Sequence, residues 1–175
     1  MDAEESEKCL SMHQPWASLL VAGIKRIEGR SWTTKLRGRL WIHATQKVPK
    51  REEIDELETF YRTLFEMLGQ EVVFPEHYPS GVLLGSVEVV DCMKAEEVKN
   101  WDGLAETLKL EVLCPMCFLC ENPRKLVLPQ KMRGYQGIWN LPKKTVKNLL
   151  PALKTSAVDP TFSWKNYMVD LTKES

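Results

Sequence analysis

Residues 12–43 combine the helix and strand signals that most restrict how this chain can fold. Pro15 suits the first helical position, because its missing N–H costs nothing there, and apolar residues recur at helical spacing up to Gly23, a common helix end. Residues 25–32 then alternate in an extended or bulged pattern, and residues 40–44 are apolar and strand-like. A short helix between strands predicts a small sheet with helices packed on it.

The rest of the chain adds elements of both kinds. Residues 81–91 are apolar and β-branched, which predicts a central, buried strand. Apolar residues at helical spacing between Pro49 and Gly69 predict the clearest helix, whose other face is acidic. Further strands are expected within residues 8–12, 118–120, 124–128 and 138–141, and short helices within 94–110 and 143–154. The pattern predicts an α+β domain with about five or six strands in a strongly curved sheet and three or four helices.

The length and composition predict one globular domain. The chain has 175 residues and a 43% apolar fraction, enough for a hydrophobic core. No run approaches the roughly 18 apolar residues of a membrane span and no export signal opens the chain, so we expect a soluble intracellular protein. We expect residues 1–7 to be a linker remnant of a longer protein, 8–155 to form the domain and 156–175 to be a C-terminal extension.

The five cysteines are an odd number, which favours free thiols in a reducing compartment over a disulfide framework. Cys114, Cys117 and Cys120 follow each other at the spacing of metal ligands. Zinc normally takes four ligands, and this segment supplies at most three, so we expect no metal and no cofactor. A fourth ligand from His77, Cys92 or Glu121 is the alternative that the sequence leaves open.

The net charge is zero, but the charges are arranged in blocks. Residues 25–51 carry nine basic residues against one acid, residues 52–111 carry fifteen acids against four bases, and residues 124–147 carry seven bases and no acid. Two basic blocks that converge in the fold would form a positive face that binds polyanions. The alternative is that each block is a separate solvated surface.

A nucleic-acid interface is the function that uses most of these residues. Lysine and arginine bind phosphates without regard to sequence, and exposed aromatic rings stack on unpaired bases. The candidate stacking residues are Trp16, Trp32, His13 and His43, and of the tryptophans we expect only Trp32 to be exposed. Tyr135 adds an aromatic ring in residues 130–137, a glycine-containing loop suited to close approach to a backbone. The candidate phosphate contacts are Lys25, Arg30, Lys35, Arg37, Arg39, Lys47, Lys131 and Arg133.

Enzymatic function has weaker support. Ser86 lacks the sequence of a nucleophile elbow, and the chain has no phosphate-binding glycine loop. A lysine and carboxylate dyad of Lys25 with Glu28 or Glu88 is the catalytic alternative. We favour the hypothesis that Lys25, Glu28 and Arg30 form a charge network at the mouth of a cleft, with no catalytic role.

The segment from His13 to Arg30 resembles the signature of the ASCH domain family. The family pattern G-x-K-x-x-E-x-R after a first helix is matched at every fixed position, by Gly23, Lys25, Glu28 and Arg30. Residues 81–91 resemble a later strand of the family, and the resemblance covers roughly residues 8–150. It implies a PUA-like fold, a small β-barrel with flanking helices, and a cleft lined by the four signature residues.

The resemblance also implies a function. It implies nucleic-acid binding linked to transcription coactivation, in the nucleus and cytoplasm, with nuclear receptors and the subunits of a complex that includes a helicase as partners, and a link to ribosome quality control. Some bacterial members are small amidohydrolases acting on acylated nucleosides, with the motif lysine, a threonine three positions later and a strand glutamate. Here Glu28 occupies the threonine position, which argues against hydrolysis.

We therefore expect a non-enzymatic module that binds DNA or RNA through phosphates, with little sequence preference. The two alternatives are an amidohydrolase at the same cleft and a protein-interaction module that uses the acidic helix of residues 51–68.

Overall fold

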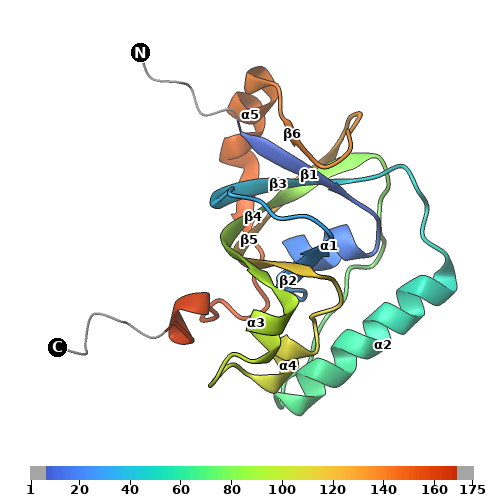
Figure 1. The fold of residues 1–175 in the computed structure, drawn as a ribbon. Helices are drawn as coiled ribbons and strands as arrows, with labels where there is room; N and C mark the ends of the chain where they lie inside the picture. Colours follow the sequence, from blue (N-terminus) through green and yellow to red (C-terminus); the bar gives the residue numbers. More distant parts are fainter. Residues whose placement is uncertain (1–6, 169–175) are drawn as a thin grey trace.

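The computed structural model describes residues 7–168. Its centre is a curled, mixed sheet of seven strands in the order β2-β5-β4-β3-β1-β6, with β7 paired to β5 (Figure 1). The strands are β1 (Lys8–Met12), β2 (Ile27–Arg30), β3 (Gly38–Ala44), β4 (Val82–Lys94), β5 (Met116–Lys131), β6 (Ile138–Asn140) and β7 (Leu153–Thr155). The helices are α1 (Trp16–Val21), α2 (Arg51–Met67), α3 (Ala95–Lys99), α4 (Glu106–Lys109), α5 (Lys143–Leu149), and the 3-10 helices η1 (Leu150–Ala152) and η2 (Trp164–Asn166).

The long strands β4 and β5 bend the sheet into a half-barrel. Their antiparallel register shifts at three places, between Leu83 and Gly85, between Ser86 and Glu88, and between Val89 and Asp91. Each shift inserts extra residues on one strand, which increases local twist and curvature. Gly85 permits the tightest approach, because a side chain there would overlap the carbonyl oxygen of Arg124.

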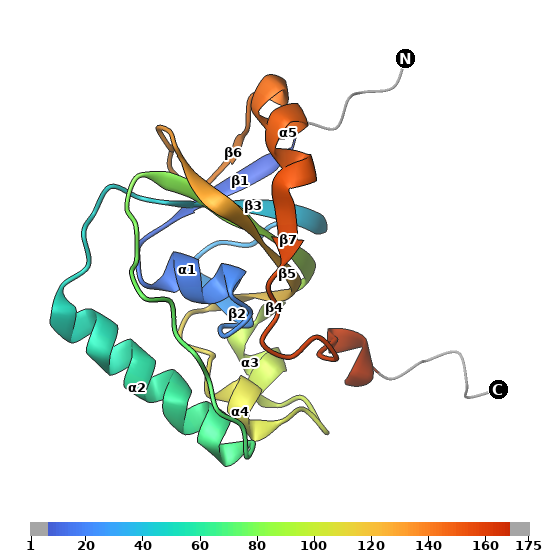
Figure 2. The same cartoon turned by 180° about the vertical axis from the view of Figure 1, so that it is seen from behind.

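Helix α1 lies between the concave face of the sheet and α2 (Figure 2). One side of α1 packs Leu20 and Val21 against the sheet core, and the other packs Leu19 against α2. Helix α2 buries the apolar stripe that its sequence spacing predicted, namely Leu57, Tyr61, Leu64 and Phe65. Burial of these side chains on both sides fixes α1, and with it the start of the signature segment, against the sheet.

The α+β architecture that the sequence predicts, a strongly curved sheet with flanking helices, is confirmed, with differences in its strands. The expected strands at 118–120 and 124–128 are one continuous strand, β5, which passes through Asn122 at a positive φ of 48°. The described residues hold seven strands where five or six were expected. The additional strand, β7, is only three residues long and exists because the backbone of β5 is free to pair with it from Arg124 to Leu126.

The segment after residue 155, expected as a C-terminal extension, packs back onto the domain as far as it is described. Trp164 is 0% exposed, and its indole N–H donates to the carbonyl oxygen of Cys120 at 2.8 Å. The last residues of the extension, 169–175, and residues 1–6 of the expected linker lie outside the described residues. None of the helices in the described part of the chain is long and apolar enough to cross a membrane.

Candidate functional site

One charge network joins three signature residues in β2 and just before it, namely Lys25, Glu28 and Arg30. The Glu28 carboxylate lies 3.2 Å from Lys25 Nζ and 3.3 Å from Arg30 Nε. Lys25 also donates to the carbonyl oxygen of Ile27, and it is only 5% exposed. Arg30 donates to the carbonyl oxygen of Ser11 at 3.3 Å, so its side chain links β2 to β1, two strands that do not pair with each other.

A second buried carboxylate, Glu111, lies behind this network. It accepts hydrogen bonds from the backbone N–H of Arg26 at 3.0 Å and from the hydroxyl of Tyr61 at 2.8 Å. Burial raises the pKa of Glu111, and the nearby positive charge of Lys25 opposes that rise. No sequence pattern distinguishes Glu111, because it is one of the fifteen acids in residues 52–111.

The network lines a cavity of about 340 Å³, which we call the signature cleft. Trp16 forms one wall, with Lys25 Nζ 5.4 Å from its ring centroid, and His13 and Thr45 form part of the rim, with their side chains 2.7 Å apart. The lining consists of Ser11, Met12, His13, Trp16, Lys25, Glu28, Gly29, Arg30, Thr45, Glu111, Leu113 and Cys114. The cleft thus combines an aromatic wall with charged groups that already hold one another.

Two larger grooves continue from the cleft. The central groove, of about 830 Å³, shares Ser11, His13, Arg30 and Thr45 with the cleft. It adds two candidate aromatic residues and one candidate base, Trp32, Tyr135 and Arg133. The outer groove, of about 880 Å³, shares Trp32 and Gly137 with the central groove and adds Glu7, Lys8, Thr34, Lys35, Leu36, Arg37, Arg39 and Ile138. The central groove therefore adjoins the signature cleft through four shared residues and the outer groove through two.

The loop of residues 132–137 is held against the sheet by His43. The ring of His43 is 2% exposed, and its Nε2 lies 2.8 Å from the carbonyl oxygen of Met132. Gly134 lies directly against the same ring, and a Cβ there would come within 2.6 Å of His43 Cε1. Burial lowers the pKa of His43. This close backbone approach is what brings Arg133 and Tyr135 to the central groove.

The predicted site residues differ in exposure and in partners. Trp32 is 36% and Tyr135 55% exposed, so both present ring surface to the grooves. Arg37 pairs with Asp91 at 3.0 Å, while Lys35 is exposed in the outer groove. Lys25 is buried at the cleft wall, unlike the other candidate phosphate contacts. Lys47 and Lys131 are exposed but line none of the three hollows.

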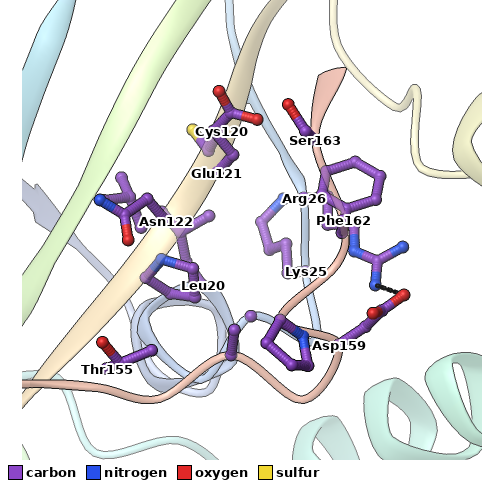
Figure 3. A pocket seen from close by; sticks show the side chains of 15 residues that line it. Leu20, Lys25, Arg26, Cys120, Glu121, Asn122, Thr155, Asp159, Phe162 and Ser163 are labelled. Carbon is purple, nitrogen blue, oxygen red and sulfur yellow. Dashed lines mark ion pairs between the residues drawn. The ribbon is translucent and has the colours of Figure 1, made fainter. Parts of the chain in front are cut away.

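Gly23 lines a second cavity of about 220 Å³, which shares Lys25 with the signature cleft; Figure 3 shows this cavity. Gly23 follows the end of α1 in the left-handed conformation, with a φ of +75°. A Cβ at this position would come within 2.9 Å of Pro123. Arg26 lies at the same cavity, where its guanidinium is 3.9 Å from the ring centroid of Phe162 and 3.9 Å from Asp159 Oδ2. The cavity is thus closed on one side by the segment after β7.

The catalytic dyad weighed for Lys25 and Glu88 is not assembled. Glu88 accepts a hydrogen bond of 3.0 Å from the Asn122 amide, and it lines neither of the cavities that Lys25 lines. The carboxylates coupled to Lys25 are instead Glu28 and Glu111.

The cysteines are all free thiols. Burial raises the pKa of Cys117 to about 11 and that of Cys120 above its ordinary range. Cys114 lies beside Gly29 at the signature cleft. Within residues 7–168, no group of three or more histidine, cysteine or acidic side chains is placed to hold a metal ion.

Comparison with known proteins agrees with the signature. The family model of the ASCH domain matches residues 10–130. Activating signal cointegrator 1 from Homo sapiens and its counterpart from Mus musculus are each 48% identical to this chain over 136 residues, which is 78% of this chain and 22% of either relative. This chain therefore spans less than a quarter of the length of these relatives.

A solved structure shares the fold at low sequence identity. The crystal structure of a mutant ASCH protein from Zymomonas mobilis has a TM-score of 0.50 and 15% identity, with 85% of this chain and 97% of that chain covered. Because the family model matches more than half of the sequence, the assignment does not depend on this likeness. This chain belongs to the ASCH domain family.

Proposed function

We propose that this ASCH domain is a non-enzymatic module that binds DNA or RNA, mainly through phosphates and with little sequence preference. One observation carries the proposal: two basic and aromatic segments about a hundred residues apart meet at one groove. Arg30 and Trp32 from the first segment line the central groove with Arg133 and Tyr135 from the second. Convergence of this kind is what distinguishes a polyanion site from two separately solvated basic surfaces.

The central and outer grooves together offer both kinds of contact that a nucleic-acid strand uses. Arg133 and Lys35 are exposed cations that can pair with phosphates. Trp32 and Tyr135 present exposed rings on which unpaired bases can stack. The guanidinium of Arg133 lies 5.3 Å from the Tyr135 ring centroid, an arrangement that holds cation and ring side by side. A strand lying along the grooves would meet phosphate contacts and stacking surfaces in turn.

The cleft chemistry supports binding over hydrolysis. An activated lysine needs a free ammonium or amine aimed at the reacting atom, together with a base. Here the Lys25 ammonium already contacts Glu28 and the Ile27 carbonyl, and Glu88 is held elsewhere by Asn122. These contacts favour a structural role for Lys25.

Fluorescence anisotropy with labelled single- and double-stranded oligonucleotides of unrelated sequence tests the proposal. We expect binding that weakens steeply with salt, with a slope set by the number of phosphates contacted. Arg133→Glu should weaken binding to all sequences alike. Lys165→Glu is the matched control, because Lys165 is exposed on η2, at the far side of the domain from the loop of Arg133 (Figure 1). Binding that does not depend on salt, or no binding at all, would contradict the proposal.

We further propose that the domain serves a transcription coactivator. Support comes from the relatives, whose name is activating signal cointegrator 1 and which are much longer than this chain. In this proposal the longer protein works in the nucleus and cytoplasm, contacts nuclear receptors and coactivator-complex subunits including a helicase, and takes part in ribosome quality control. Affinity purification of the full-length protein, with and without this domain, tests which partners depend on it.

The acidic face of α2 favours a second candidate function, protein interaction. The helix buries one stripe on α1 and leaves Glu52, Asp55 and Glu56 exposed on the other side. A pull-down that survives nuclease treatment, and that fails when Glu52, Glu53 and Glu56 are replaced by lysine, would support this function over nucleic-acid binding.

A further inference from the structure

Glu7 holds two hydrogen-bond donors at the edge of the outer groove. One carboxylate oxygen lies 3.2 Å from Arg39 Nη1, and the other accepts a hydrogen bond of 3.1 Å from the indole N–H of Trp41. The backbone of Glu7 is fixed as well, because its carbonyl oxygen accepts the N–H of Leu141 at 3.0 Å. An acidic side chain is thus anchored in a groove whose other charged lining residues are Lys8, Lys35, Arg37 and Arg39.

The two donors are arranged for an anion with two neighbouring oxygens. A guanidinium N–H and a neutral N–H, aimed at the two oxygens of one carboxylate, also match two non-bridging oxygens of a phosphodiester. Trp41 is 0% exposed, so its indole N–H is a fixed donor rather than a mobile surface group. A buried N–H of this kind must keep an acceptor, and either a carboxylate or a phosphate supplies one.

The place of these donors in the fold connects them to the proposed nucleic-acid surface. Arg39 and Glu7 line the outer groove together with Lys35, Arg37 and Trp32, and Trp32 also lines the central groove. A strand that extends from the central groove past Trp32 therefore enters the groove in which the Glu7 carboxylate lies. Arg39 would be available to that strand only after Glu7 has left it.

We infer that Arg39 and the Trp41 indole N–H form a phosphodiester subsite of the outer groove, and that Glu7 occupies this subsite in the free protein. The inference rests on the proposed function, and it adds a residue that competes with the nucleic acid for its own site. This competition predicts a specific change in the salt dependence of binding. In the wild type, a phosphate that pairs with Arg39 releases its condensed cations while the freed Glu7 carboxylate takes up cations, whereas without the charge of Glu7 this release is not offset.

Replacement of Glu7 by glutamine tests the role of its negative charge while keeping a side chain of similar shape. Glutamine keeps an oxygen that can accept the Trp41 N–H, but it removes the negative charge that holds Arg39. We expect Glu7→Gln to bind single-stranded DNA about threefold to fivefold more tightly at moderate salt. We also expect the slope of log K against log salt to steepen by about 0.7, the cation release of one phosphate contact on a single strand, which cation uptake by a freed Glu7 no longer offsets.

Asp55→Asn is the matched control. Asp55 pairs with Arg51 at 3.2 Å on α2, so this variant also removes one carboxylate from an arginine pair, and Asp55 lines none of the three hollows. We expect no change in its affinity or salt slope. Equal tightening in both variants would show that net charge alone acts, and would overturn the inference. Arg39→Gln introduced into Glu7→Gln should abolish the gain, and persistence of the gain would also overturn it.

The indole N–H resonance of Trp41 reports on the subsite directly. In nitrogen–proton correlation spectra of the wild type, this resonance, assigned by its loss in Trp41→Phe, should shift when oligonucleotide is added. A wild type that binds oligonucleotide while Trp41 stays unshifted, or while Glu7→Gln leaves affinity and slope unchanged, would overturn the subsite and leave the proposed function standing. A wild type that binds no oligonucleotide would overturn both.

Discussion

The hydroxyl of Tyr61 donates a hydrogen bond of 2.8 Å to the carboxylate of Glu111 inside the core. Tyr61 is 2% and Glu111 6% exposed, and burial raises the pKa of both groups above their ordinary values. Glu111 also accepts the backbone N–H of Arg26, within the signature segment. This carboxylate therefore joins α2 to the signature segment just before β2.

Tyr61→Phe removes the hydroxyl and keeps the ring. Because the Glu111 carboxylate then loses a buried donor, we expect the free energy of unfolding to fall by about 1–3 kcal/mol in urea denaturation. Tyr78→Phe is the control, since Tyr78 donates a bond of the same length, 2.8 Å, to Glu58 at a more exposed place. A loss in Tyr78→Phe equal to that in Tyr61→Phe would contradict the importance of the buried contact.

Gly134→Ala tests whether close packing on His43 positions the binding loop. A Cβ at this position would come within 2.6 Å of His43 Cε1 and 2.7 Å of Ser11 Oγ, so the loop must move outward. We expect a loss of about 1–3 kcal/mol in stability from overpacking. Displacement of Arg133 and Tyr135 should also weaken oligonucleotide binding. The exposed neighbour Gln136 provides the control, because Gln136→Ala removes a side chain without forcing the loop to move.

The elements with a strong local pattern could be predicted from the sequence. The apolar run at 81–91 became the central strand β4, and the spacing between Pro49 and Gly69 became α2. Strand β7 could not be predicted, because three residues carry no periodic signal and their conformation depends on the free edge of β5. The continuity of β5 was missed for a similar reason: Asn122 is typical of a turn, but its amide is held by Glu88 across the sheet.

Contacts between residues distant in sequence also limit how much of the site can be predicted. The spacing of Lys25, Glu28 and Arg30 places them within a few residues of one another, so their contacts follow from the signature. Glu111 contacts Arg26 across 85 positions of sequence, and nothing local distinguishes it from the solvated acids around it. The convergence of the two basic blocks was a hypothesis from charge alone. The hydrogen bond between His43 and the Met132 carbonyl and the packing of Gly134 on the His43 ring show how the second block reaches the groove.

His43 should make stability depend on pH. Burial lowers its pKa in the folded state below the ordinary value of 6.5, so the unfolded chain binds a proton first as the pH falls. The contribution of His43 to stability is then fully present above about pH 6.5, and it is lost as the pH falls from there toward the pKa of the folded state. Urea denaturation at pH 7.5 and 5.5 measures this loss. His43→Gln should reduce it, whereas His77→Gln, at an exposed position, should not.

Trp32→Ala should weaken binding to single strands more than binding to duplexes. Stacking of an unpaired base on an aromatic ring contributes about 1–3 kcal/mol, which corresponds to roughly fivefold to 150-fold in affinity. Bases in a duplex are already stacked and gain little from the ring. Trp32→Phe retains an aromatic face and should recover most of the loss in anisotropy measurements. Equal weakening for both kinds of nucleic acid would show that Trp32 acts through the shape of the groove instead.

Lys25→Ala should destabilise the domain, because Lys25 is a buried counterion. Its ammonium lies 3.2 Å from Glu28, and its charge also acts on Glu111, so its removal leaves two buried carboxylates with less compensation. Breaking a buried ion pair by removing one partner typically costs about 3–5 kcal/mol, and we expect a loss of that order in urea denaturation.

The double variant Lys25→Met with Glu28→Gln separates this role from catalysis. It removes both charges of the pair while keeping similar volumes, so it should recover much of the stability that Lys25→Ala loses. Recovery of stability in the double variant, with no turnover of acylated nucleosides by the wild type, is the expected pair of results. Turnover by the wild type that disappears in both variants would instead identify Lys25 as a catalytic residue, because the double variant keeps similar volumes and removes both charges of the pair but supplies no ammonium group.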